Sequence, residues 1–120
     1  MREDRNDISE RLLNFAVGII KLAPRLNKTA VGRHISGQLT KSGTSSGANY
    51  EEACAAESRA DFIHKLQIVL KELRETLYWL RLIKKAALIS SNDKNLLGLL
   101  QETEELTNII AKSIITAKRN

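Results

Sequence analysis

The stretch from Ser58 to about Ile89 constrains the fold of this chain most strongly, because it contains no Pro and no Gly and is dominated by Glu, Lys, Leu and Arg. These residues have high helix propensity. Ser58 is a favourable N-cap, and Asp61 three residues later gives a pattern similar to a capping box. Apolar side chains recur at steps of three and four residues, on one helical face: Phe62, Leu66, Val69, Leu73, Leu77, Leu80 and Ile83. We therefore predict a long amphipathic helix over residues 58–89 that buries this face against other helices.

The same periodicity predicts three more helices, over about residues 7–25, 29–56 and 94–118. The connections between the four helices are short, which implies antiparallel neighbours. A chain of 120 residues has the size of one domain and can bury a core without disulfides. We therefore predict a single all-α domain, residues 1–120, folded as an antiparallel up-and-down four-helix bundle.

The second predicted helix changes character halfway along. Its early apolar face, which includes Val31, Ile35 and Leu39, continues into small and polar residues beside Gly43 and Gly47. Each Gly costs about 1 kcal/mol in a helix relative to Ala, and the run over residues 42–47 is typical of a loop when taken alone. We favour a helix, bent at Gly43, because the face periodicity persists and small residues let a neighbouring helix approach closely. The alternative is a break within this run.

Polar side chains lie along the later part of the same helix: Gln38, Ser42, Ser46, Asn49 and Glu52. We interpret them as a structural polar network inside the bundle, which fixes the register of the helices. The alternative is a small polar pocket or a contact with nucleic acid.

The net charge of +5 is distributed unevenly along the chain. Residues 11–50 contain six Lys or Arg and no Asp or Glu. A segment of one sign can contact a polyanion, and the candidate nucleic-acid-binding residues are Arg25, Lys28, Arg33 and Lys41. The alternative is a solvated helix surface that is basic but binds no ligand.

The third predicted helix carries a second apolar strip on its outer side, where the helix of a monomeric bundle is polar. Trp and Tyr are enriched at interface hot spots, so we predict a subunit interface there. Scattered surface apolar residues are the alternative. The predicted interface residues are Ile68, Glu75, Tyr78, Trp79 and Leu82.

No motif in the sequence indicates an active site. His34, His64 and Cys54 are far apart in sequence, so we expect no metal, no cofactor and no enzymatic activity. A single cysteine fits a reducing compartment, and the polar N-terminal residues lack the features of a secretory signal. The longest apolar stretch, near residues 12–20, is too short to span a bilayer. We therefore expect a cytoplasmic protein.

The segment over residues 37–53 reads GQLTKSGTSSGANYEEA. It resembles a sequence typical of the four helix bundle protein family, also described as the 23S ribosomal RNA intervening-sequence protein family. Residues 58–66, 71–72 and 75–80 resemble the third helix of that family, and the likeness covers about residues 8–118. The resemblance implies an up-and-down four-helix bundle that assembles into a homopentameric ring. A related accessory protein of diversity-generating retroelements is a basic pentamer that works with a reverse transcriptase and nucleic acid.

These observations lead to two main hypotheses for function. The first is a non-enzymatic oligomeric scaffold that binds RNA or DNA through its basic surface and is linked to an rRNA intervening sequence or a mobile element. Assembly would multiply the charge and the avidity of such a scaffold. The second is a protein–protein adaptor for a neighbouring enzyme such as a reverse transcriptase. Membrane binding through the first helix is the least favoured alternative.

Overall fold

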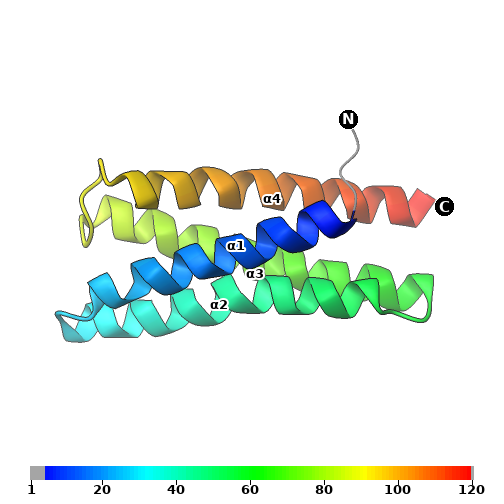
Figure 1. Ribbon diagram of the computed structural model, residues 1–120, viewed down its shortest axis with the longest axis horizontal. Coiled ribbons are helices and arrows are strands. Elements are labelled where there is room, and N and C mark those ends of the chain that lie inside the picture. Colours follow the sequence, from blue (N-terminus) through cyan, green and yellow to red (C-terminus); the bar gives the residue numbers. More distant parts are fainter. Residues whose placement is uncertain (1–4, 120) are drawn as a thin grey trace.

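The structure is a computed structural model that describes residues 5–119. Within these residues it contains four α-helices and no strand, which confirms the predicted all-α class. Figure 1 shows the helices side by side, with successive helices running in opposite directions. α1 and α3 each pack against both α2 and α4, so the four helices form an antiparallel bundle. The helices are α1 (Arg5–Leu22), α2 (Ala30–Cys54), α3 (Arg59–Lys85) and α4 (Lys94–Arg119), with a 3-10 turn, η1 (Ala23–Leu26), after α1.

Three helices end earlier than their sequence patterns predicted, α2 by only two residues, at Cys54. α1 stops at Leu22 because the chain tightens into η1, where Pro24 occupies one of the first positions. α3 stops at Lys85, before the predicted end at residue 89. There Ala87 adopts a left-handed conformation with φ of 55°. The amide of Leu88 donates to the carbonyl oxygen of Ile83 at 3.0 Å, in the manner of a Schellman motif.

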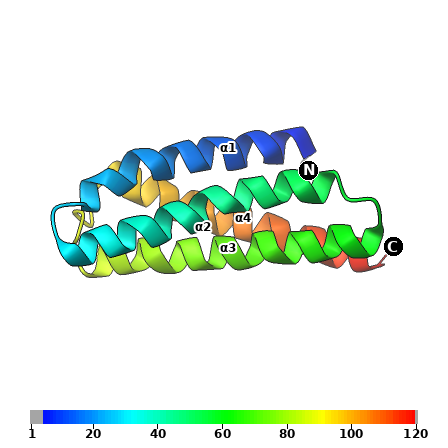
Figure 2. The same ribbon diagram turned by 90° about the horizontal axis from the view of Figure 1, so that it is seen from below.

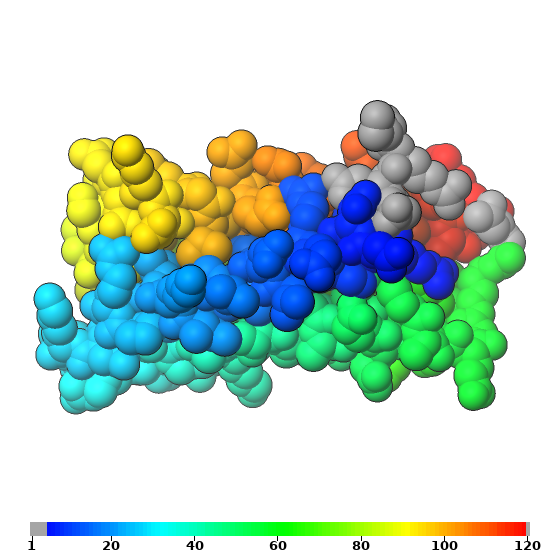
Figure 3. Space-filling model, in the orientation of Figure 1, coloured from blue at the N-terminus to red at the C-terminus, as the bar shows by residue number. Residues whose placement is uncertain are grey.

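α2 is continuous through residues 42–47, so the alternative of a break there is wrong. Gly43 faces α1, and a Cβ atom at this position would lie 2.9 Å from two side-chain carbons of Ile19. Gly47 lies one turn further along, beside Leu12. Ile19 and Leu12 are fully buried. The two glycines, which have no side chain, therefore let α1 lie close to α2. Figure 3 shows the face of the molecule on which α1 lies between α2 and α4.

On its other side, α2 contacts α3 through a buried pair of hydroxyl groups. Ser42 and Thr76 are both fully buried. Their hydroxyl oxygens lie 2.9 Å apart, and Thr76 Oγ1 is also 2.8 Å from the carbonyl oxygen of Glu72. The pair satisfies two polar groups that would otherwise be costly to bury. It fixes the register of α2 against α3.

Gly32, in the first turn of α2, is the least replaceable of the α2 glycines. A Cβ atom on Gly32 would lie 1.8 Å from the carbonyl oxygen of Leu26, which is backbone and cannot rotate away. We expect Gly32→Ala to lower the free energy of unfolding by about 1–3 kcal/mol, the usual range for overpacking. Gly37→Ala is the matched control, because a Cβ there meets nothing within 4 Å. Its better helix propensity should raise the free energy of unfolding by up to about 1 kcal/mol. Urea unfolding followed by circular dichroism measures both, and equal effects of the two variants would contradict this account.

Candidate nucleic-acid interface

The α1–α2 and α3–α4 connections lie at the same end of the bundle, which Figures 1 and 2 both show at the left. The α2–α3 connection lies at the opposite end. We call residues 21–33 together with residues 81–94 the double-loop end. Two segments that are about fifty residues apart in sequence thus form one surface.

The double-loop end is strongly basic. It contains eight Lys or Arg, all of them exposed, and one acidic residue, Asp93. The rest of the chain contains eleven basic and thirteen acidic residues. Helix dipoles offset one another in an antiparallel bundle, so the positive potential at this end comes from side chains. The eight cations are Lys21, Arg25, Lys28, Arg33, Arg81, Lys84, Lys85 and Lys94.

One ion pair joins the two segments of this surface. Arg25 donates to Asp93 Oδ2 at 2.6 Å, while Asp93 Oδ1 caps α4 by accepting from the amide of Leu96 at 3.0 Å. The Arg25 guanidinium, and then the Leu96 amide, hold the pKa of the Asp93 carboxyl below its usual value. The pKa of Arg25 is raised by the same hydrogen bond.

The other seven cations form no ion pair with any residue between positions 5 and 119. The Arg33 guanidinium is 3.4 Å from the carbonyl oxygen of Asn27, and no salt bridge involves Lys21, Lys28 or the four cations of residues 81–94. Cations without a carboxylate partner remain available to phosphate. These cations are therefore better placed to bind a polyanion than to stabilise the fold through ion pairs.

The structure brings together three of the four predicted nucleic-acid-binding residues. Arg25, Lys28 and Arg33 lie at the double-loop end. Lys41 is exposed but lies further along α2, about 12 Å from Arg33 at the helical rise of 1.5 Å per residue. Lys21 and the four cations of residues 81–94 also lie at this end and were not among the predicted binding residues. These cations could have been predicted from the up-and-down topology, because it places the first and third connections at one end of the bundle.

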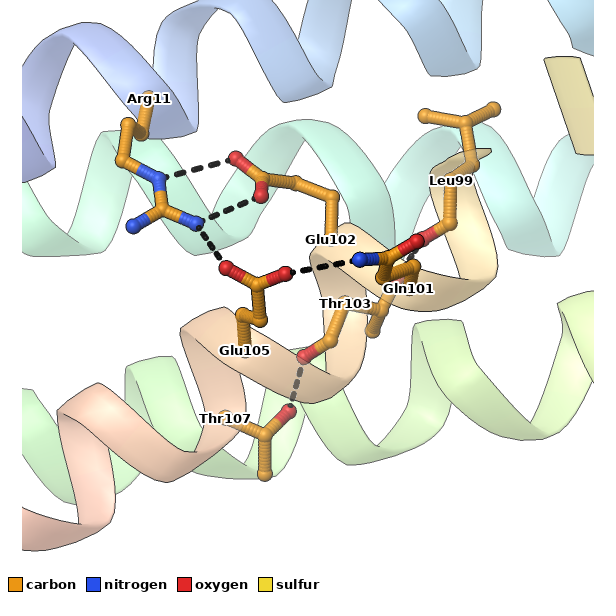
Figure 4. A network of polar contacts seen from close by, with 7 residues as sticks. All are labelled: Arg11, Leu99, Gln101, Glu102, Thr103, Glu105 and Thr107. Atoms are coloured by element: carbon orange, nitrogen blue, oxygen red, sulfur yellow. Dashed lines mark hydrogen bonds and ion pairs between the residues drawn. The ribbon is translucent and has the colours of Figure 1, made fainter. Parts of the chain in front are cut away.

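Arg11, another cation of the acid-free stretch, is neutralised by α4. Its guanidinium binds Glu102 at 2.6 and 3.1 Å and Glu105 at 3.1 Å, and Gln101 donates to Glu105 at 3.3 Å. Figure 4 shows these contacts between the two helices. Residues 11–50 are therefore purely basic in sequence, but in the folded protein the surface around Arg11 also contains the carboxylates of Glu102 and Glu105.

The predicted interface residues lie on the outer side of α3, and two of them also pack against the core of this chain. Trp79 and Leu82 are half-buried and pack against the core. The Trp79 ring contacts His34 of α2 edge-on, at 6.3 Å between centroids, and the Tyr78 ring at 5.1 Å. Tyr78 is 59% exposed. Trp79 Nε1 is buried and has no hydrogen-bond partner among the described residues. Ile68 is half-buried and Glu75 is exposed.

The predicted polar network exists only in part. Ser42 and Ser46 are buried, and Asn49 donates to the carbonyl oxygen of Ser45 within the same helix. Gln38 and Glu52 form no hydrogen bond with a described residue, and Glu52 is exposed. The contacts that cross to α3 are instead Ser42 with Thr76 and Ser45 with Glu72, the latter at 2.8 Å. The partners on α3 were missed, because a Thr and a Glu inside a helix give no sign of which neighbour they meet.

Residues 5–119 contain no cluster of three or more His, Cys, Asp or Glu side chains placed to hold a metal ion. Over the same residues no helix is long and apolar enough to cross a membrane. Cys54 is a half-buried free thiol.

Together these features define a small antiparallel four-helix bundle with one strongly basic end. The chain belongs to the family of 23S rRNA-intervening sequence proteins, whose family model matches residues 4–112. It is also similar to a solved structure, described as a protein of unknown function from the S23 ribosomal protein family of Bacteroides thetaiotaomicron. The identity is 37%, the TM-score is 0.82, and the match covers 92% of this chain and 96% of the other. No curated protein matches this chain.

The lowered pKa of Asp93 has a consequence for stability at acid pH. A carboxyl group whose pKa is lower in the folded than in the unfolded state stabilises the fold above its unfolded pKa, and this contribution is lost as the pH falls through the folded value. We therefore expect Asp93→Asn to reduce the loss of stability between about pH 5 and pH 2. Glu57→Gln, which removes an exposed carboxylate that has no ion pair among the described residues, is the charge-matched control. Thermal unfolding measured across this range tests the difference, and parallel pH profiles for wild type and Asp93→Asn would count against it.

Proposed function

We propose that this protein is a non-enzymatic RNA-binding scaffold that contacts phosphates with its double-loop end. The observation that carries the proposal is the eight exposed cations against one carboxylate at that end, seven of them without an ion pair. Phosphate contacts supply most of the affinity of such proteins for nucleic acid. The name of the family, which refers to an intervening sequence of 23S rRNA, favours RNA over DNA as the ligand. We place this activity in the cytoplasm, where Cys54 would remain a thiol.

Charge reversal at the double-loop end tests this proposal. We expect Lys28→Glu/Lys94→Glu to weaken binding of a structured RNA by at least about tenfold at low salt, and to reduce the slope of log K against log salt by about 1 to 2. The readout is a mobility shift at two salt concentrations.

The matched control is Lys112→Glu/Lys118→Glu, which changes the net charge equally but alters the opposite end of α4. At the higher of the two salt concentrations, about 0.1 M, it should bind within about threefold of wild type, because screening then limits charge effects to about 10 Å. Equal losses for the two variants would mean that net charge, and not the double-loop end, controls binding. No shift of wild type at low salt would refute the proposal altogether.

We further propose that the scaffold is a homo-oligomer, and a pentameric ring is the form that the family resemblance implies. The apolar cluster on α3 supports this proposal, because Tyr78 is exposed and Trp79 and Leu82 are only half-buried. A neighbouring subunit would cover the exposed Tyr78 ring. Repeating the double-loop end in each subunit would raise the avidity for a long polyanion.

Trp79 is the only tryptophan, so its emission reports on this surface directly. We expect the emission maximum to shift to longer wavelength on dilution, as subunits separate and water reaches the ring. Trp79→Ala should lower the oligomer order in light scattering while helicity persists. Ile115→Ala, at an exposed position on α4, should leave the oligomer unchanged. A monomeric wild type at micromolar concentration would contradict the proposal.

An adaptor for a partner protein is the second candidate function. It is favoured by an exposed apolar stripe on the outer side of α1, at the helical spacing of four and three residues: Leu13, Val17 and Ile20. Their exposed fractions are 57%, 42% and 53%. Such a stripe suits the apolar face of a partner helix. Wild-type RNA binding that is abolished by charge reversal at the double-loop end would favour the scaffold over the adaptor.

A further inference from the structure

A groove of about 610 Å³ opens between α3 and α4 at the double-loop end. Its α3 wall is cationic and is formed by Arg81, Lys84 and Lys85. Its α4 wall is apolar near the loop, where Leu97 and Leu100 lie, and acidic one turn further along, at Glu104. The volume lies within the range of ordinary small-ligand sites.

The groove combines an exposed apolar side chain with cations that have no ion pair among the described residues. Leu97 is 39% exposed beside three cations, although a polar residue at that position would be better solvated. None of the three cations forms an ion pair with Glu104 or with any other described residue. Phosphate binding alone would use the cations, whereas the exposed leucine adds an apolar surface against which part of a ligand can pack.

An unstacked nucleotide has both of the required parts. Its base presents a flat apolar face, and its phosphate is an anion a few ångströms away. In a duplex the base faces are stacked and covered, whereas single strands, loops and bulges can offer them to a protein. Glu104 repels phosphate but can accept a hydrogen bond from the exocyclic amino group of a base.

Gln101, which lies one turn before Glu105 on α4, is held in place by a neighbouring side chain. Gln101, which also lines the groove, donates its amide to Glu105, and Glu105 is bound by Arg11. Figure 4 shows this chain of contacts from Arg11 through Glu105 to Gln101. The Gln101 side-chain oxygen is therefore left as a second acceptor beside Glu104.

We propose that this groove receives one unstacked base of a single-stranded RNA segment, with the base against Leu97 and Leu100 and the flanking phosphate on Arg81, Lys84 and Lys85. The inference rests on the proposed function and sharpens it. It assigns single-stranded loops, bulges or ends of RNA as the ligand class, in preference to duplex. An acidic peptide fits the groove less well, because its carboxylates would meet Glu104.

Fluorescence anisotropy with two RNAs of equal phosphate number tests this inference. One probe is an unstructured oligocytidine strand, whose bases carry exocyclic amino groups, and the other is a blunt duplex. We expect wild type to bind the single strand at least about fivefold more tightly than the duplex. Leu97→Ser should lose most of this preference and leave duplex binding within about twofold.

Ile115→Ser is the matched control, since Ile115 is also exposed on α4 but lies far from the groove. It should retain the wild-type preference. Equal binding of the two RNAs by wild type, or an unchanged preference in Leu97→Ser, would overturn the inference while leaving RNA binding itself intact. Displacement of the single strand by a polyglutamate peptide of equal charge would also overturn it, because charge alone would then fill the groove. Absence of binding to either RNA would refute the proposed function as well.

Discussion

α2 approaches its two neighbours more closely than ordinary side chains allow. On the α1 side, a Cβ atom on Gly43 would lie 2.9 Å from the buried Ile19 side chain. On the α3 side, the small hydroxyl of Ser42 meets Thr76 at 2.9 Å. Larger residues at these positions would force the helices apart and open the core, at a cost that protein interiors do not tolerate well. The stripe of small residues on α2 therefore determines how α1 and α3 are placed, and α4 completes the bundle against both of them.

The position of the charges follows from this packing. An up-and-down bundle places its first and third connections at one end, and here both connections are basic. The double-loop end carries eight cations and one carboxylate. The repulsion among the cations must be offset by the burial of apolar side chains elsewhere in the chain. The Arg25–Asp93 pair relieves one such charge, and because it is exposed it adds little stability of its own. An anionic ligand would reduce the repulsion among these cations, so the double-loop end is suited to bind one.

The sequence predicts the bundle well, because the helical faces repeat over many turns. The continuity of α2 could be predicted from the persistence of its face through Gly43 and Gly47. The end of α3 could not, because the left-handed residue that stops it is Ala87 and not the Gly or Asn that usually marks such an end.

The candidate site was predicted less completely than the fold. Charge counted along the chain found Arg25, Lys28 and Arg33 but included Arg11, whose partners Glu102 and Glu105 lie more than ninety residues away. The same count missed the cations of residues 81–94, because they lie about fifty residues further along the chain and only the fold brings them beside residues 21–33. Pairing across helices depends on their register, and a periodic pattern in one helix does not contain that information.

Lysine footprinting of the unmodified protein tests the central claim most directly. Acetylation of each lysine is measured by mass spectrometry with and without a structured RNA that contains single-stranded loops. The account predicts that RNA protects the lysines of the double-loop end and leaves Lys65, Lys112 and Lys118, which lie towards the opposite end, as reactive as before. Uniform protection of all lysines, or protection confined to the opposite end, would contradict it. The residues expected to be protected are Lys21, Lys28, Lys84, Lys85 and Lys94.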